Sequence, residues 1–190
     1  MADSRTSYFA KVSEYARVAG AKYGIRPEIL LAITAFESAY GTSANFLQGN
    51  NPGGITYSKT RQTPYWDGKS LRARPASEGG YYYKYATLQD GFFDEALVLS
   101  GSRYAKAIQV QDDPVAFAAA FVKSGYFTDP NQPAYATALK QNIPIFRTMY
   151  AGEAVVETVK KKRTGSLQSQ QRRSSSADTS ISEHATDKKV

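Results

Sequence analysis

The chain has 190 residues, no Cys and a single His, His184, which lies in a polar segment near the C-terminus. This composition excludes disulfides, thiol nucleophiles and thiolate metal sites, and it leaves no His for a catalytic triad or a zinc site in the aromatic-rich region before residue 150. The formal net charge of +7 favours an anionic partner such as a wall polymer, nucleic acid or a membrane surface, without choosing among them.

The opening segment, MADSRTSYFAKVSEYARV, contains no uninterrupted apolar run. It therefore indicates neither a secretory signal peptide nor a membrane span. We expect a protein that is made in the cytoplasm and that reaches any extracytoplasmic target by a route without a cleaved leader.

Two helices are predicted in the first forty residues. Apolar residues recur at spacings of three and four from Ser4 to Tyr23, and Gly24 suits the end of that helix. Pro27 suits the first turn of a second helix, which we expect to continue to about Tyr40 and to end at Gly41.

Residues 42 to 80 are rich in Gly, Pro and Asn, and they predict an irregular segment. So long an irregular stretch inside a compact domain is usually functional. A strand rich in aromatic residues, Tyr81 to Tyr85, follows it. We expect a small β-hairpin lobe between about Tyr65 and Tyr85.

Helical periodicity returns in the second half of the chain. Helices are predicted from Leu88 to Ser100 and from Pro114 to Lys123, the second with Asp113 as its N-cap. A last helix is predicted from about Gln132 to Tyr150, with a kink or a new start at Pro144.

The composition changes after Tyr150 to Lys, Arg, Ser and Gln, with few aliphatic residues. Such a segment cannot bury enough apolar surface to offset its ordering entropy. We therefore predict a folded domain over residues 1–150 and a flexible basic tail over residues 151–190. The tail is either a solvated end or an electrostatic tether to wall polymer, DNA or a protein partner.

Glu37 is the first candidate for chemistry. It lies on the predicted apolar stripe Leu30, Ile33, Glu37 and Tyr40, immediately before Gly41 and the irregular segment. A partly buried Glu has its pKa raised by desolvation, which is the condition for a general acid near neutral pH. The alternative is an ordinary Glu that reaches solvent or pairs with an Arg.

A glycosidase of the lysozyme type also needs a second group across the cleft. The lobe and its border offer three acids, Asp67, Glu78 and Asp90. Glu78 is favoured because it directly precedes the aromatic strand. A solvated hairpin Glu is the alternative.

Several motifs occur in a fixed order: Glu37-Ser38-Ala39-Tyr40-Gly41-Thr42-Ser43, Asn50-Asn51 with Gly54-Ile55, Trp66-Asp67-Gly68, Glu78, Tyr83-Lys84-Tyr85, Asp94, and Gly125-Tyr126-Phe127-Thr128-Asp129-Pro130. This set resembles the landmarks of the N-acetylglucosaminidase domain of glycoside hydrolase family 73, over roughly residues 10 to 150. Bacterial autolysins, the flagellar rod-cap muralytic domain and phage wall hydrolases belong to that family. The NN-x-x-GI and GY-x-TDP pieces are more specific than ES-x-x-G, which lytic transglycosylases share.

The resemblance implies a mainly α, lysozyme-like domain with a small β-hairpin lobe beside the active-site cleft. It makes Glu37 the general acid, Glu78 the acid of the lobe and Tyr126 the active-site Tyr. The residues expected to contact the sugar chain are Asn51, Trp66, Tyr83, Tyr85 and Asp129. Trp66, Tyr81, Tyr82, Tyr83 and Tyr126 could stack on sugar rings or simply pack in the protein. No cofactor and no metal are expected.

The implied activity is hydrolysis of the β-1,4 bond after N-acetylglucosamine in peptidoglycan. The expected binding partner is therefore the peptidoglycan glycan strand. Two alternatives stay open: a lytic transglycosylase of the same fold, and a non-catalytic wall-binding or assembly module of a virion or secretion machine. Nucleic acid and a membrane span are not expected. A phage particle or phage lysis setting is our preferred expectation, with partners reached through the basic tail.

Overall fold

The structure is a computed structural model, and it describes residues 3–126 and 132–154. The chain divides into two compact units, Met1–Thr148 and Met149–Val190. In chain order the elements are α1 (Ser4–Tyr23), α2 (Pro27–Glu37), α3 (Ala44–Gly49), β1 (Leu71–Ala73), β2 (Tyr81–Tyr83), α4 (Leu88–Leu99), the 3₁₀ helix η1 (Ser102–Tyr104), α5 (Ala105–Gln109) and α6 (Pro114–Lys123). Residues 132–154 are also helical.

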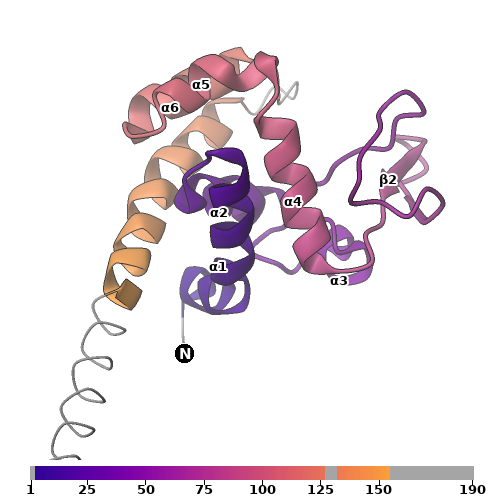
Figure 1. Cartoon of the computed structure of the whole chain (residues 1–190), viewed down its shortest axis with the longest axis horizontal. Coiled ribbons are helices and arrows are strands. Elements are labelled where there is room, and N and C mark those ends of the chain that lie inside the picture. Colours follow the sequence, from indigo (N-terminus) through magenta and orange to yellow (C-terminus); the bar gives the residue numbers. More distant parts are fainter. Residues whose placement is uncertain (1–2, 127–131, 155–190) are drawn as a thin grey trace, which may run out of the picture. The chain divides into compact units, whose positions relative to one another are not determined.

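Helix α2 is the centre of the first unit. Every residue from Ile29 to Ala35 has no exposed surface, as expected for a helix that is apolar on all sides. Helices α1 and α4 pack against it, and α4 lies between α2 and the hairpin (Figure 1). The hydroxyl of Tyr8 on α1 donates to Thr34 Oγ1 at 2.8 Å, so the one buried hydroxyl of α2 is satisfied inside the core.

The predicted end of α2 was wrong by three residues, because the helix stops at Glu37 rather than near Tyr40. Ser38 Oγ donates to Thr34 O at 2.5 Å and accepts from the Gly41 backbone amide at 2.9 Å. These bonds replace helical ones, and Ala39 and Tyr40 then adopt left-handed φ values of 48° and 54°. Glu37 is therefore the last residue of a buried helix.

The expectation of an irregular stretch from residue 42 to 80 missed α3. Ser43 caps this short helix by accepting from the Phe46 amide at 3.3 Å, and the buried ring of Phe46 fixes it to the core. The β-hairpin is confirmed: β1 and β2 are antiparallel, with Leu71 opposite Tyr83. Residues 55–57 run along the other edge of β2, where the Tyr57 amide donates to Tyr81 O at 2.8 Å.

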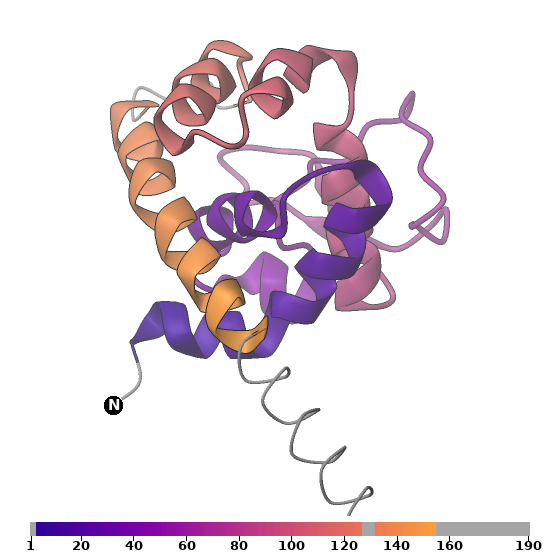
Figure 2. The ribbon, with the colours of Figure 1, turned by 60° about the vertical axis from the view of Figure 1, so that its left-hand side comes forward.

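The helices of the second half largely match the sequence-based expectations. Helix α4 ends one residue earlier than predicted, and α6 has the predicted bounds and the predicted Asp113 cap, which accepts from the Val115 amide at 2.8 Å. The alternative of a new helix start at Pro144 is wrong, because residues 132–154 are helical without interruption (Figure 2), while the alternative of a kink stays a prediction. Ile143 and Phe146 on either side of it are fully buried, and this packing outweighs the cost of a Pro in the helix.

Helices α5 and η1 were not predicted from the sequence. Among the helices of the described ranges, none combines the length and the hydropathy that a membrane crossing requires.

The predicted tail, residues 151–190, lies outside the described residues except for 151–154, which are helical. The division at residue 150 therefore stays a prediction.

Candidate functional site

Glu37 opens onto a pocket of about 240 Å³ at the C-terminal end of α2. The pocket joins segments that are far apart in the sequence: the loop after α3, the end of α4, η1 and the segment that follows α6. The other lining residues are Gly53, Gly54, Ile55, Thr56, Val98, Tyr104 and Tyr126.

The carboxyl group of Glu37 is held in a site that disfavours its charge. Its Oε1 atom is buried without a hydrogen-bond partner in the described part of the chain. Burial raises the pKa of Glu37 to about 7, while the hydroxyl of Tyr135 acts in the opposite direction. The burial predicted from the helical stripe is therefore observed, and Glu37 retains its proton in a large fraction of molecules at neutral pH.

A second buried carboxyl group, Glu95 on α4, lies next to the pocket and was not singled out from the sequence. Glu95 has no exposed surface, and burial raises its pKa to about 8, with a further contribution from the charge of Glu37. Its Oε2 atom is buried with no hydrogen-bond partner among residues 3–126 and 132–154. A signal for it existed in the sequence, since Phe92, Glu95 and Leu99 form the same kind of stripe that identified Glu37.

Gly53 and Gly54 allow the loop after α3 to lie directly on these carboxyl groups. A Cβ atom at Gly53 would lie 1.9 Å from Glu95 Oε2, and one at Gly54 would lie 3.6 Å from Glu37 Oε2. Gly54 also has a φ of 63°, which favours glycine. The glycines of the NN-x-x-GI segment thus bring the backbone against both acids.

Tyr126 completes the wall of the pocket. Its ring packs on Phe121 and Tyr104, with centroid distances of 4.8 and 5.7 Å. Its hydroxyl lies 2.9 Å from Glu95 Oε1 and 3.3 Å from Gly53 O. The phenol is therefore fixed by a carboxyl group on one side and a pocket carbonyl on the other.

Glu78 lies in the turn between β1 and β2, where it is exposed. Its carboxylate accepts from Arg74 Nη2 at 2.6 Å and lies 3.5 Å from the Tyr82 hydroxyl. No hydrogen bond or ion pair joins it to Glu37 in the described structure. Asp67 and Asp90, the other two acids considered, accept backbone bonds in a turn and in the capping box of α4.

Most of the residues expected to contact sugar are engaged within the lobe. Asn51 is buried and bonds the backbone of Ile55 and Tyr83, which ties the pocket loop to β2. Tyr83 is fully buried between Trp66 and Tyr85, and Trp66 is half-buried. Asp129 lies outside the described residues. The assignment of these residues to substrate binding stays a prediction.

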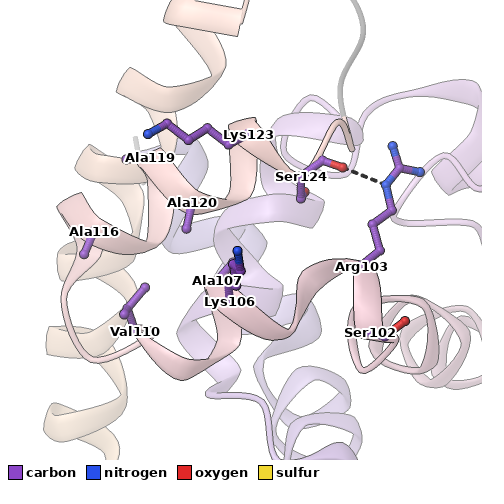
Figure 3. Close-up of a pocket in the computed structure, with 10 residues that line it drawn as sticks. All are labelled: Ser102, Arg103, Lys106, Ala107, Val110, Ala116, Ala119, Ala120, Lys123 and Ser124. Atoms are coloured by element: carbon purple, nitrogen blue, oxygen red, sulfur yellow. Dashed lines mark hydrogen bonds between the residues drawn. The ribbon is translucent and has the colours of Figure 1, made fainter.

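A larger hollow, of about 690 Å³, lies between α5 and α6 and shares no lining residue with the Glu37 pocket (Figure 3). Arg103 in this hollow donates to Ser124 O at 2.7 Å and also to Gly125 O. It thereby anchors the backbone that leads into Tyr126. Across the described ranges, no three His, Cys, Asp or Glu residues gather as a metal site would require.

Sequence comparison identifies related proteins. The glucosaminidase family, described as mannosyl-glycoprotein endo-beta-N-acetylglucosaminidase, matches residues 13–147. The chain is 26% identical over 150 residues to the peptidoglycan hydrolase FlgJ of Vibrio parahaemolyticus, which covers 74% of this chain and 48% of that protein. The chain therefore spans about half the length of this curated relative.

Two solved structures share the fold. The glycoside hydrolase domain of Salmonella typhimurium FlgJ has a TM-score of 0.61 at 22% identity and covers 85% of this chain and 99% of that one. A peptidoglycan hydrolase of Sphingomonas sp. A1 has a TM-score of 0.59 at 24% identity and covers 77% and 93%. These likenesses confirm the predicted fold class, a helical lysozyme-like domain with a small β-lobe. Since the family match spans most of the chain and contains Glu37, Glu78 and Tyr126, the chain belongs to the glucosaminidase family.

Proposed function

We propose that the chain is a peptidoglycan hydrolase that cleaves the β-1,4 bond after N-acetylglucosamine in cell-wall glycan strands. The observation that carries the proposal is the Glu37 carboxyl group, protonated by burial and open to a pocket at the end of α2. Membership of the glucosaminidase family and the similarity to peptidoglycan hydrolases support this substrate.

The first step is general acid catalysis by Glu37. The protonated carboxyl group donates its proton to the glycosidic oxygen while positive charge grows on the sugar ring. A pKa of about 7 suits this role, because the group still holds a proton near neutral pH and can release it to the leaving oxygen. No His or Cys is needed, and neither occurs in the domain.

The second step has two routes. In one, Glu78 activates a water molecule across the cleft, and in the other the acetamido group of the substrate attacks while Tyr126 and Glu78 orient it. Glu78 is bound to Arg74 on the lobe, and Tyr126 lies in the pocket wall beside Glu37. Tyr126 therefore has the contact with the pocket that the second route requires.

The test uses the full chain and purified peptidoglycan, with Glu37→Gln as the main variant. We expect clearing of the suspension by the wild type, a loss of about 10² to 10⁴-fold in Glu37→Gln, and products with reducing-end N-acetylglucosamine by mass spectrometry. Glu14→Gln, a change at an exposed ion pair on α1, is the matched control and should keep wild-type activity. Glu78→Gln then distinguishes the routes, since it abolishes the first, in which Glu78 is the base, and only weakens the second, in which Glu78 orients the acetamido group.

Three results would contradict the proposal, and each has a different interpretation. Equal activity of Glu37→Gln and wild type removes the role of Glu37. Anhydromuramic ends in the products indicate a lytic transglycosylase. Binding to wall without clearing, by wild type and variant alike, indicates a non-catalytic module.

We also propose a phage particle or phage lysis setting, with the basic tail as a tether to virion or secretion-machine proteins. The charge of the segment Lys160-Lys161-Lys162-Arg163 supports an electrostatic tether. Proteomic detection of the chain in purified virions would support this setting. Its detection only in uninfected bacterial cells would contradict it.

A further inference from the structure

The hydroxyl group of Tyr126 lies within hydrogen-bond distance of two oxygen atoms but has only one proton to donate. The two atoms are Glu95 Oε1 at 2.9 Å and Gly53 O at 3.3 Å. A carbonyl can only accept, and an ionised carboxylate can only accept. If Glu95 were ionised, two acceptors would compete for one proton, and one contact would be left without a hydrogen.

A neutral Glu95 solves this problem. Protonated on Oε1, it donates to the Tyr126 oxygen, and the Tyr126 proton is then free to point at Gly53 O. Gly53 and Tyr126 line the pocket, whereas Glu95 lies behind them and does not. The protonation state of Glu95 thus decides whether the Tyr126 proton points away from the pocket or into it.

We propose that Glu95 is a positioning residue that, as a neutral carboxylic acid, holds Tyr126 with its hydroxyl proton directed into the pocket, toward an acceptor oxygen on the bound sugar. This rests on the function proposed above. The bond to Gly53 O is long, so a sugar oxygen can replace that carbonyl as the acceptor at little cost.

Burial and the two nearby acids favour the neutral form of Glu95. Charged neighbours are Glu37 on α2, Asp94 on α4 and Arg61 in the lobe, of which the two acids disfavour a further negative charge and Arg61 favours it. The phenols that also interact with it are Tyr8, Tyr85, Tyr104, Tyr126 and Tyr135. Arg61 donates to Asp94 through two nitrogens, so the carboxylate of Asp94 largely neutralises its positive charge.

The test compares Glu95→Gln with Glu95→Leu in the full chain. A Gln amide donates to the Tyr126 oxygen at every pH, whereas Leu cannot donate. At pH 6 we expect Glu95→Gln to stay within about threefold of the wild-type kcat and Glu95→Leu to lose about tenfold, the effect of one hydrogen bond. In a Tyr126→Phe background, Glu95→Leu should cause almost no further loss, because the group that it positions is already gone.

The pH profile separates positioning from a purely structural role. Near pH 8 the wild-type rate should fall more steeply than the rate of Glu95→Gln, by up to about tenfold in total, because Glu95 loses its proton as well as Glu37. In Glu95→Gln only Glu37 titrates, so its slope should not be steeper than −1. Equal slopes in the two proteins across this range would overturn the proposal.

A measurement without substrate keeps the inference independent of the proposed activity. Carboxyl ¹³C shifts of labelled Glu, assigned by comparison with Glu37→Gln and Glu95→Gln, report each titration directly. We expect Glu95 to be protonated at pH 6 and its midpoint to rise in Tyr126→Phe, because the bond to Tyr126 favours the charged form. An ionised Glu95 at pH 6 refutes the inference even if the chain hydrolyses wall, and a neutral one supports it even if Glu37→Gln disproves the hydrolase.

Discussion

Asp94 and Glu95 are neighbours on α4 and both are fully buried, but Asp94 bonds to side chains on the side of the β-lobe and Glu95 bonds to Tyr126 in the pocket wall. Asp94 accepts from Arg61, from Thr63 Oγ1 at 2.6 Å and from the Tyr85 hydroxyl at 2.5 Å. Glu95 has only Tyr126, and one of its oxygens has no partner in the described part of the chain. The lobe therefore uses a buried acid as an ion-paired anchor, whereas the two acids at the pocket have no bound cation in the described part of the chain, and burial raises their pKa.

The largest effect on stability is expected when the buried charge on α4 that anchors the lobe is removed. Asp94→Asn leaves Arg61 without its carboxylate and weakens the bonds from Thr63 and Tyr85. Breaking a buried pair from one side costs about 3 to 5 kcal/mol, and because Arg61 is 24% exposed we expect about 2 to 4 kcal/mol. Urea unfolding monitored by circular dichroism measures the loss.

Glu78→Gln is the matched control for this change, because it also breaks an Arg–carboxylate pair of the lobe. The Arg74–Glu78 pair is exposed, so its loss should change the free energy of unfolding by less than about 0.5 kcal/mol. Equal losses in Asp94→Asn and Glu78→Gln would contradict the distinction between an anchoring pair and a surface pair.

Neutralising Glu37 at the pocket should have the opposite effect to Asp94→Asn. It should raise the free energy of unfolding at alkaline pH. Glu37 has an ordinary pKa of 4.5 in the unfolded chain and about 7 when folded. Below pH 4.5 both states are protonated, so burial has no linked cost. Between pH 4.5 and 7 the unfolded state loses its proton first, so stability falls as pH rises, and above pH 7 the loss is complete.

Glu37→Gln removes this loss because its side chain does not titrate. We expect the variant to be about 1 to 3 kcal/mol more stable than wild type at pH 8 and nearly equal to it at pH 4.5. Thermal unfolding at the two pH values measures the difference. A variant less stable at pH 8 would show that the Glu37 carboxylate is stabilised in the fold, against the burial argument.

The sequence predicts the helical frame better than it predicts the site. Helices α1 and α6 have the predicted bounds because periodicity, Gly24 and the Asp113 cap are local signals. The end of α2 and the continuity through Pro144 depend on Ser38 bonds and on tertiary packing, which local propensity does not contain.

For the site, the stripe through Glu37 was sufficient to predict its burial. Glu95 obeys the same rule, but the motifs that resemble the family contain the adjacent Asp94 and not Glu95. What places Glu95 directly behind the pocket wall is its contact with Gly53 and Tyr126, 42 residues before it and 31 residues after it. Such a contact depends on the folded chain and is not encoded in the spacing of residues along α4.

The smallest effect is expected when a cation is brought to the pocket, whose described lining residues include no Lys or Arg. Thr56 lines the pocket and is exposed, so Thr56→Lys can place an ammonium group near Glu37 without filling the core. A nearby positive charge favours the carboxylate and lowers the pKa of Glu37. We expect the alkaline limb of the wall-clearing activity to move down by about half a pH unit, a shift typical of an exposed charge in water.

Thr56→Gln controls for the size of the new side chain, and its alkaline limb should match that of wild type. The shift in Thr56→Lys should also shrink at 0.5 M salt, because the interaction is partly screened by solvent ions. An unchanged limb in Thr56→Lys at low salt would mean that solvent already screens the pocket. In that case the absence of a cation would not be what keeps Glu37 protonated, and the contrast with the ion-paired Asp94 would lose its explanation.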